Sequence, residues 1–87
     1  MNTVNPTQIY TLYVDSGAIS FSDADYDYRY YRLIVTGAPS ALVNITLNDQ
    51  TFDLAGGIVI DAPIYQLTVN SGDGVLLFGS KSVRQIF

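Results

Sequence analysis

Apolar and polar residues alternate along several short segments of this 87-residue chain, and this period of two constrains the fold most. Val43, Ile45 and Leu47 fall on one face of an extended strand, and Asn44 and Thr46 fall on the other. Besides this strand at 42–47, short strands are expected at 9–14, 18–21, 28–35, 50–54, 58–60, 65–69, 75–78 and 81–87. No stretch of ten residues has a helical period, and with no Glu and one Lys the chain lacks two main helix formers.

Clusters of Gly, Pro, Asn and Asp separate these segments, as turns do between strands. Asn48-Asp49 predicts a hairpin turn, Gly57 predicts a positive φ or a bulge, and residues 70–74 predict a further turn. Seven to eight short strands at this spacing predict an all-β fold. We expect an antiparallel β-sandwich, jelly-roll-like or immunoglobulin-like, or a small barrel. Residues 1–7 are expected to form a loose N-terminal arm, and residues 8–87 a single domain.

Two of the segments give expectations about side-chain orientation. In residues 28–35, strict alternation places Tyr31 with Leu33 and Val35 on one side, and Tyr30, Arg32 and Ile34 on the other. Residues 58–60 are wholly apolar, which predicts a short strand that is buried on both sides. The sequence Asp61-Ala62-Pro63 is expected to end that strand.

The composition excludes several kinds of chemistry. The chain contains no Cys, His, Trp or Glu, and all eight acidic residues are Asp. Disulfide frameworks, cysteine or histidine zinc sites and every mechanism that pairs a nucleophile with histidine are therefore excluded. Because nearly every Asp falls in a predicted turn or loop, we expect no catalytic pair, no enzymatic activity and no cofactor.

The net charge of −4 argues against nucleic acid and against an anionic membrane surface as partners. Residues 1–6 are polar and lack the basic start and apolar run of a signal peptide. The longest apolar runs, such as residues 75–78, are too short to span a bilayer. We expect a soluble protein made in the cytoplasm.

The least ordinary segment interleaves tyrosine with arginine between residues 26 and 32. In an extended strand Tyr26, Tyr28 and Tyr30 line one face, while Arg29 and Tyr31 point to the other. Tyr and Arg are enriched at protein interfaces, and they also stack on sugars. One face is expected to pack inward and the other to meet a partner. The candidate partner-binding residues are Tyr26, Tyr28, Arg29, Tyr30, Arg32, Ile86 and Phe87.

Asp23, Asp25 and Asp27 have the alternating spacing with which calcium loops bring carboxylates to one cation. The pattern lacks the Gly and Glu that an EF-hand needs further on, where this chain has Tyr28 and Ile34. A solvated acidic loop is therefore preferred, with the three Asp kept only as weak metal candidates.

The second half of the chain has a strand, a polar turn, an apolar residue followed by Asp-Ala-Pro, and another strand, in that order. The residues that carry this order are Val43 to Leu47, Phe52-Asp53-Leu54, Ile60-Asp61-Ala62-Pro63 and Leu67-Thr68-Val69. Over residues 42–79 the chain resembles small all-β virion proteins of bacteriophages: capsid decoration or cement proteins, minor head proteins and spike or tail-associated proteins. The resemblance implies a structural protein of the virion, made in the host cytoplasm, that binds other virion proteins and copies of itself. It also implies a trimer.

The composition of the chain also favours self-association. Only 12 of 87 residues are charged, and a single Lys is available to guard strand edges against pairing. Two alternatives remain open. One is a small carbohydrate-binding or host-attachment module that uses Tyr and Asp, and the other is a calcium-dependent adhesion domain centred on Asp23, Asp25 and Asp27.

Overall fold

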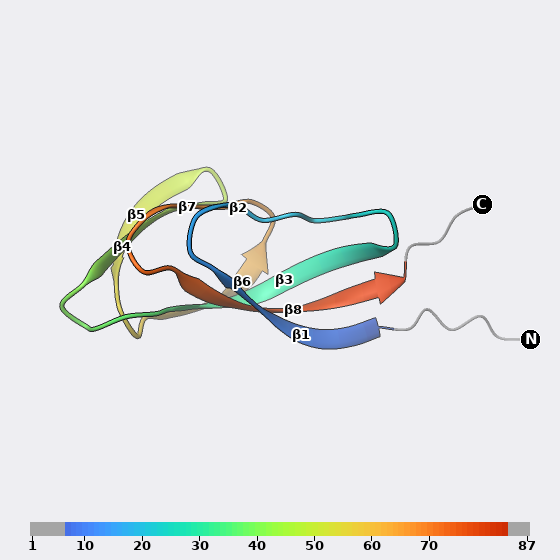
Figure 1. The fold of residues 1–87 in the computed structure, drawn as a ribbon, viewed down its shortest axis with the longest axis horizontal. Helices are drawn as coiled ribbons and strands as arrows, with labels where there is room; N and C mark the ends of the chain where they lie inside the picture. The colour runs from blue at the N-terminus through green and yellow to red at the C-terminus, as the bar shows by residue number, and fades with distance from the viewer. Residues whose placement is uncertain (1–6, 84–87) are drawn as a thin grey trace, which may run out of the picture.

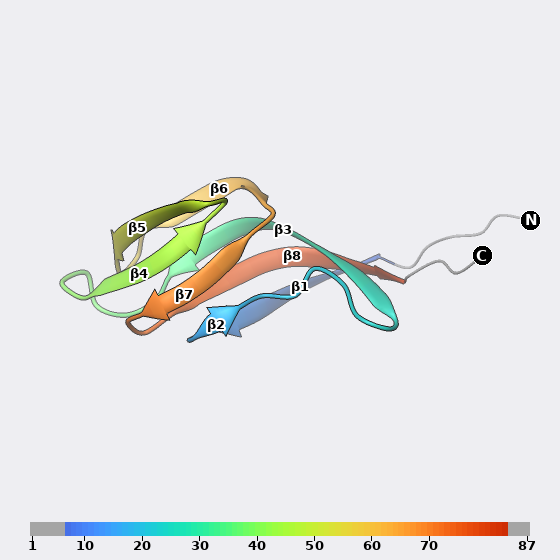
Figure 2. The same ribbon diagram turned by 90° about the horizontal axis from the view of Figure 1, so that it is seen from above.

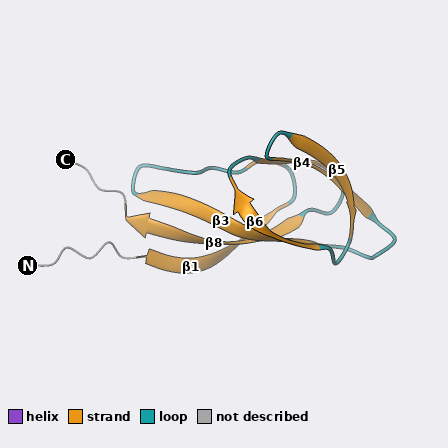
Figure 3. Cartoon of the chain, turned by 180° about the vertical axis from the view of Figure 1, so that it is seen from behind, coloured by secondary structure: helices purple, strands orange, loops and turns teal. Residues whose placement is uncertain are grey.

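The computed structural model describes residues 7–83, which form eight β-strands and no helix (Figures 1 and 3). The strands are β1 (Thr7–Val14), β2 (Gly17–Ala18), β3 (Tyr26–Val35), β4 (Leu42–Leu47), β5 (Gln50–Ala55), β6 (Val59–Ile64), β7 (Leu67–Ser71) and β8 (Val75–Val83). The absence of helix in the described part agrees with the strand-forming composition. The expected N-terminal arm lies outside the described residues except for Thr7, which begins β1.

The strands form two four-stranded antiparallel sheets that pack face to face (Figure 2). We call β1-β8-β3-β6 sheet A and β2-β7-β4-β5 sheet B. Strand pairs β1–β8, β2–β7, β3–β6 and β4–β5 are nested, as when one long hairpin is folded over into two layers. This is the connectivity of the eight-stranded jelly roll. The all-β sandwich expected from the sequence is confirmed.

The core between the sheets is built from alternate residues of the strands. On β4, Val43, Ile45 and Leu47 are buried, as the alternation predicts. Sheet A contributes Leu33 and Leu77, which are both fully buried. Burial of a side chain of this size stabilises the fold by about 1.5–3 kcal/mol, so this layer supplies most of the packing energy of a small domain.

The turn predicted at Asn48-Asp49 is confirmed. Both residues have positive φ, 48° and 67°, which is the left-handed pair that a two-residue hairpin needs between twisted strands. The Asn48 side chain also accepts hydrogen bonds from the backbone N–H of Tyr65 at 3.0 Å and of Gln66 at 3.2 Å. The β4–β5 hairpin is thereby tied to the β6–β7 turn. Gly57 has a φ of 91°, as predicted.

The strict alternation expected along β3 is wrong because the strand contains a bulge. The pairing of β3 with both β6 and β8 shifts register between Tyr30 and Arg32. Opposite β8, Tyr30 and Arg32 pair with the adjacent residues Gly79 and Phe78, so β3 has one extra residue there and the phase of the strand reverses. Opposite β6 the same step runs from Ile64 to Asp61, so the extra residue of that pair lies on β6. Tyr30 is 4% exposed and faces the core with Leu33, whereas Tyr31 is 46% exposed on the other face.

The prediction for residues 58–60 is also wrong. Ile58 and Val59 are 42% and 50% exposed, and β6 continues through residues 61–63 to Ile64. Since β6 is an edge strand, Pro63 can lie in it without removing a ladder hydrogen bond on the paired side.

Other strand boundaries also differ from the prediction. β8 is continuous through Gly79, and in place of the segment at 18–21 the chain forms β2, which shares only Ala18 with it. The segment at 65–69 becomes Leu67–Ser71, with Tyr65 exposed before it. Residues 84–87, with the candidates Ile86 and Phe87, lie outside the described residues.

Candidate functional site

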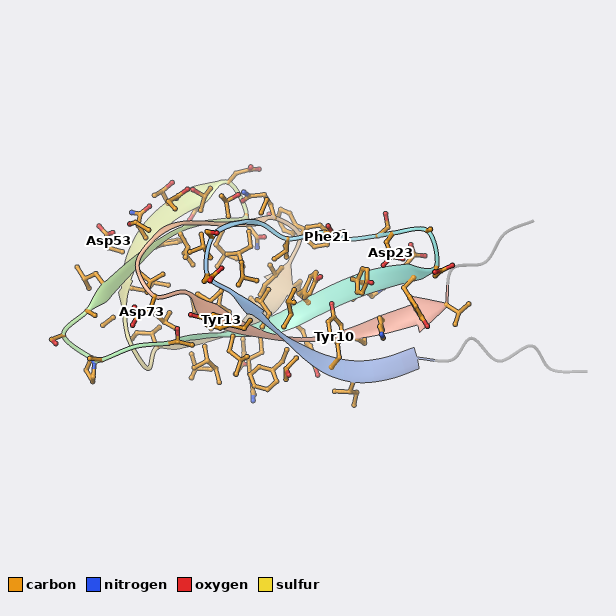
Figure 4. All side chains as sticks on the ribbon, viewed as in Figure 1. Tyr10, Tyr13, Phe21, Asp23, Asp53 and Asp73 are labelled. Atoms are coloured by element: carbon orange, nitrogen blue, oxygen red, sulfur yellow. The ribbon has the colours of Figure 1, made fainter. Side chains whose placement is uncertain are left out.

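Strands β1, β3 and β8 extend beyond sheet B (Figure 1). Five aromatic rings gather at this end of the molecule. The β2–β3 connection, residues 19–25, runs over these strand ends in place of the second sheet. Figure 4 shows Tyr10 on β1, with Phe21 and Asp23 on the connection above it. We call the group Tyr10, Phe21, Tyr26, Tyr28 and Tyr30 the aromatic cluster.

The cluster is one packed unit. The Tyr28 and Tyr30 rings stack with centroids 6.3 Å apart and an interplanar angle of 11°. The Phe21 ring meets Tyr30 edge-on at 5.4 Å, and the Tyr10 ring lies 5.7 Å from Tyr28 and 6.1 Å from Tyr30. Such pairs stabilise by about 0.5–1.5 kcal/mol each beyond the area that they bury. The cluster therefore extends the core under the connection.

Three of the candidate residues, Tyr26, Tyr28 and Tyr30, do line one face of β3, and that face points inward. Tyr26 and Tyr28 are half-buried. Tyr30 is buried, and its hydroxyl donates to the Ser20 carbonyl at 2.7 Å, which fastens the connection to sheet A. The proposal of Tyr30 as a partner-binding residue is therefore corrected, because its ring belongs to the core. Burial raises the pKa of Tyr30.

Asp23 caps the turn that leads into β3. One carboxylate oxygen accepts the backbone N–H of Asp25 at 2.8 Å and of Tyr26 at 2.7 Å, and the other accepts the Tyr28 hydroxyl. These bonds favour the ionised carboxylate, so the Tyr28 hydroxyl and the two backbone donors lower the pKa of Asp23. The same contact with Asp23 raises the pKa of Tyr28 to about 12.

The acidic segment at 23–27 is thus a capped turn. Within residues 7–83 no three acidic side chains are grouped closely enough to hold a metal ion. The three carboxylates alternate along the chain, but Asp23 is turned back onto its own backbone.

A groove of about 480 Å³ opens between the two edge strands β1 and β2. Its walls come from Tyr10 and Leu12 of β1 and from Ile19 of the connection, with Lys81 of β8 at one end. The Tyr10 hydroxyl is buried there beside the Tyr30 hydroxyl, and burial, followed by the contact with Tyr30, raises the pKa of Tyr10. The Lys81 ammonium lies 4.6 Å from the Tyr26 ring centroid, a cation–π contact. A groove with such walls suits apolar side chains or a stacked ring.

The two arginines of the segment lie on the opposite face of β3. Arg29 and Tyr31 also line a second hollow of about 410 Å³, which the aromatic cluster shares through Phe21, Tyr28 and Tyr30 and which residues 63–65 complete. Arg32 forms a two-pronged ion pair with Asp61 of β6. The hydrogen bonds to Asp61 and its charge raise the pKa of Arg32, so the guanidinium stays paired with β6.

Apolar side chains cross the whole outer face of sheet A in one row. Tyr13, Leu76, Ile34 and Val59 occupy matched register positions on β1, β8, β3 and β6. Tyr13 is 52% exposed, and Leu76 and Ile34 are half-buried. We call these four residues the apolar row. They were absent from the candidates, although the unbroken run at 75–78 shows that β8 carries apolar side chains on both faces.

The outer face of sheet B is polar and satisfies its own hydrogen bonds. Asn70 donates to Asn44 at 2.9 Å, and Asn44 donates to Asp53 at 2.8 Å. The hydroxyls of Thr46 and Thr51 lie 3.1 Å apart. The two faces of the sandwich therefore differ in kind: sheet B is suited to water and sheet A to another apolar surface.

Comparison with known proteins gives no matching family model, no similar curated protein and no similar solved structure. Residues 7–83 contain no helix that is long and apolar enough to cross a membrane. A sandwich fold is compatible with many functions, so the surfaces of this chain are the guide to its function.

Proposed function

We propose that the chain is a non-catalytic structural protein that associates with further copies of itself through the outer face of sheet A. The observation that carries this proposal is the difference between the two faces. The apolar row spans all four strands of sheet A, while the matching positions of sheet B hold an Asn, Thr and Asp network.

The energetics favour covering sheet A. Each square ångström of apolar surface removed from water contributes roughly 25 cal/mol, and the row exposes Tyr13 at one end and Val59 at the other. Next to the row, Arg32 and Asp61 neutralise each other, so the face can be buried with little uncompensated charge. Covering sheet B would bury a hydrogen-bonded polar network, and Leu42 at the start of β4 is the large exposed apolar side chain that would be covered with it.

The setting that we propose is a bacteriophage virion, in a capsid decoration, minor head or tail-associated role. The resemblance of residues 42–79 to such proteins supports it, and so does the jelly-roll connectivity, which occurs in viral capsid domains. The same architecture also occurs in lectins, so the apolar row on sheet A is stronger support for a structural role than the fold is.

Val59→Lys tests the role of the face. Val59 lies on an exposed edge strand, so the lysine is tolerated in the monomer but opposes contact with a second apolar surface. Thr51→Lys is the matched control, because Thr51 is exposed on the edge strand of sheet B. In light scattering coupled to size exclusion, Val59→Lys should lower the mass of the assembly and Thr51→Lys should not. Equal masses for both variants and the wild type would contradict the proposal.

The groove favours a second candidate function, a carbohydrate-binding module. Its Tyr10 and Tyr28 rings could stack on a sugar, and Asp15 and Ser16 stand at its rim. Titration with a panel of soluble oligosaccharides followed by tyrosine fluorescence tests this function. Saturable binding that Tyr28→Ala abolishes and Tyr31→Ala leaves intact would establish it, and no binding by the wild type would remove it.

A further inference from the structure

Strand β1 is an unprotected edge. It pairs with β8 in unbroken register, from Thr7 opposite Ser82 to Val14 opposite Val75, so its eight residues form a regular strand. Within residues 7–83 no other strand pairs with its outer side. The strand contains neither a charged residue nor a proline. A row of backbone N–H and C=O groups on such an edge is a template for another strand.

The other three edges carry the usual protections against pairing. β2 is only two residues long. β5 places Asp53 on its outer face, and β6 contains Pro63 and the ion-paired Asp61. Short length, charge and proline each hinder strand addition. β1 is therefore the edge at which the fold allows a sheet to grow.

We propose that β1 pairs antiparallel with β1 of a second copy about a two-fold axis at Thr11, so that the two copies of sheet A form one eight-stranded sheet. This inference rests on the proposed self-association and adds a second contact to it, along the β1 edge, beside the contact through the outer face of sheet A. It gives a dimer in place of the trimer that the resemblance implies. A two-fold axis also closes the pairing, because each β1 has one free edge.

The sequence of β1 is self-complementary about Thr11. An axis there sets Ile9 opposite Tyr13 of the second copy, Tyr10 opposite Leu12, and Thr11 opposite itself. These are β-branched with aromatic, aromatic with aliphatic, and Thr with Thr, which are all stabilising cross-strand pairs. Ile9 and Tyr13, which are 80% and 52% exposed, would each gain an apolar neighbour. An axis at Leu12 would instead set Ile9 against Asp15.

In the joined sheet, the groove residues on the inner face and the apolar row on the outer face each continue from one copy into the other. On the inner face, Tyr10 and Leu12 line the groove between β1 and β2, and the second copy brings the same two side chains to its mouth. On the outer face, the two apolar rows meet through Tyr13 and make one wider apolar surface. Backbone pairing thus provides affinity, and the groove and row provide specificity.

Single cysteines test the register directly, because the natural sequence has none. Thr11→Cys places two cysteines opposite each other across the axis, within the separation of about 7 Å that a disulfide spans. Ile9→Cys is the matched control on the same strand and face, since its two copies would lie four residues apart, about 13 Å. Thr51→Cys reports random collision at an edge strand of sheet B.

Under mild oxidation by glutathione disulfide, Thr11→Cys should form a covalent dimer about tenfold faster than either control, because only its two thiols meet the distance limit of a disulfide. Equal rates for the three variants would overturn the pairing. If Val59→Lys lowers the assembly mass while Thr11→Cys stays uncrosslinked, the pairing fails and the proposed function stands. If the wild type is monomeric at every concentration, the proposed function itself fails.

Hydrogen exchange of the wild-type chain gives a second measurement that needs no substitution. Raising the protein concentration should slow exchange of the outward-pointing β1 amides, while amides of the β5 edge stay unchanged. Exchange of the β1 amides that does not depend on concentration would overturn the inference, whatever the cysteine variants do.

Discussion

Tyr30 and Tyr31 are neighbours in sequence, and the bulge in β3 gives them opposite environments. Tyr30 is 4% exposed within the aromatic cluster, whereas Tyr31 is 46% exposed on the outer face. We therefore expect Tyr30→Ala to be severely destabilising and Tyr31→Ala to be mild. Strict alternation along the strand, as the sequence suggests, would reverse this order.

The expected magnitudes follow from the contacts. Tyr30→Ala removes a buried ring and leaves a cavity beside Phe21 and Tyr28, for which about 3–5 kcal/mol is typical. A domain of this length has a free energy of unfolding of about 4–13 kcal/mol, so most of its stability is at risk. Tyr31→Ala should cost less than about 1 kcal/mol, as for other surface positions.

Tyr30→Phe measures the hydroxyl alone. It loses only the hydrogen bond to the Ser20 carbonyl and should cost about 0.5–1.5 kcal/mol. Each kcal/mol lowers the melting temperature of a domain this small by roughly 4–8 °C. Urea unfolding followed by circular dichroism gives all three values. A loss of stability in Tyr31→Ala that equals or exceeds that in Tyr30→Ala would refute the placement of the bulge.

Three further outcomes are expected. In a titration of tyrosine absorbance at 295 nm, Tyr28 should ionise near 12 rather than 10, and Asp23→Asn should bring it back toward 10. A tyrosine whose pKa is raised in the folded state contributes stability that is fully present below pH 10 and is lost as the pH rises past the folded pKa. Asp23→Asn removes this contribution, so the variant should unfold at a lower alkaline pH than the wild type. Gly79→Ala should destabilise strongly, since its Cβ would collide with the Arg29 carbonyl across the strands. Melting with and without a calcium chelator should agree within about 2 °C, well under ~1 kcal/mol, and a shift several times larger would revive the adhesion hypothesis for residues 23–27.

The sequence was informative wherever local chemistry determines structure. Asn48-Asp49 and Gly57 adopt the positive φ values that their residue types favour, and the alternation on β4 reproduces its buried face. Those features depend on one strand or one turn at a time. Period and turn chemistry are therefore enough to predict them.

The features that the sequence left undetermined depend on pairing between distant strands. The bulge after Tyr30 follows from the register of β3 with β8, and no local pattern reports it. The inward position of Tyr30 could not be predicted for the same reason. Likewise Val59 was predicted to be buried because it is apolar, yet it is exposed because its strand lies at an edge of sheet A.

The candidate site was predicted in part. Tyr26 and Tyr28 do share one face with Tyr30, but that face forms the aromatic cluster under the β2–β3 connection. The apolar row was missed because its members belong to four strands, and only their register brings them into line. The run at 75–78 was the one local signal for it.

The mass of the wild-type protein in solution tests the central claim, self-association, most directly. Light scattering coupled to size exclusion, repeated from micromolar to millimolar concentration, should give at least twice the 9.5 kDa of one chain, with dimers persisting on dilution. A single species of 9.5 kDa over the whole range would contradict the account, since β1 and the apolar row would then remain uncovered in the protein alone.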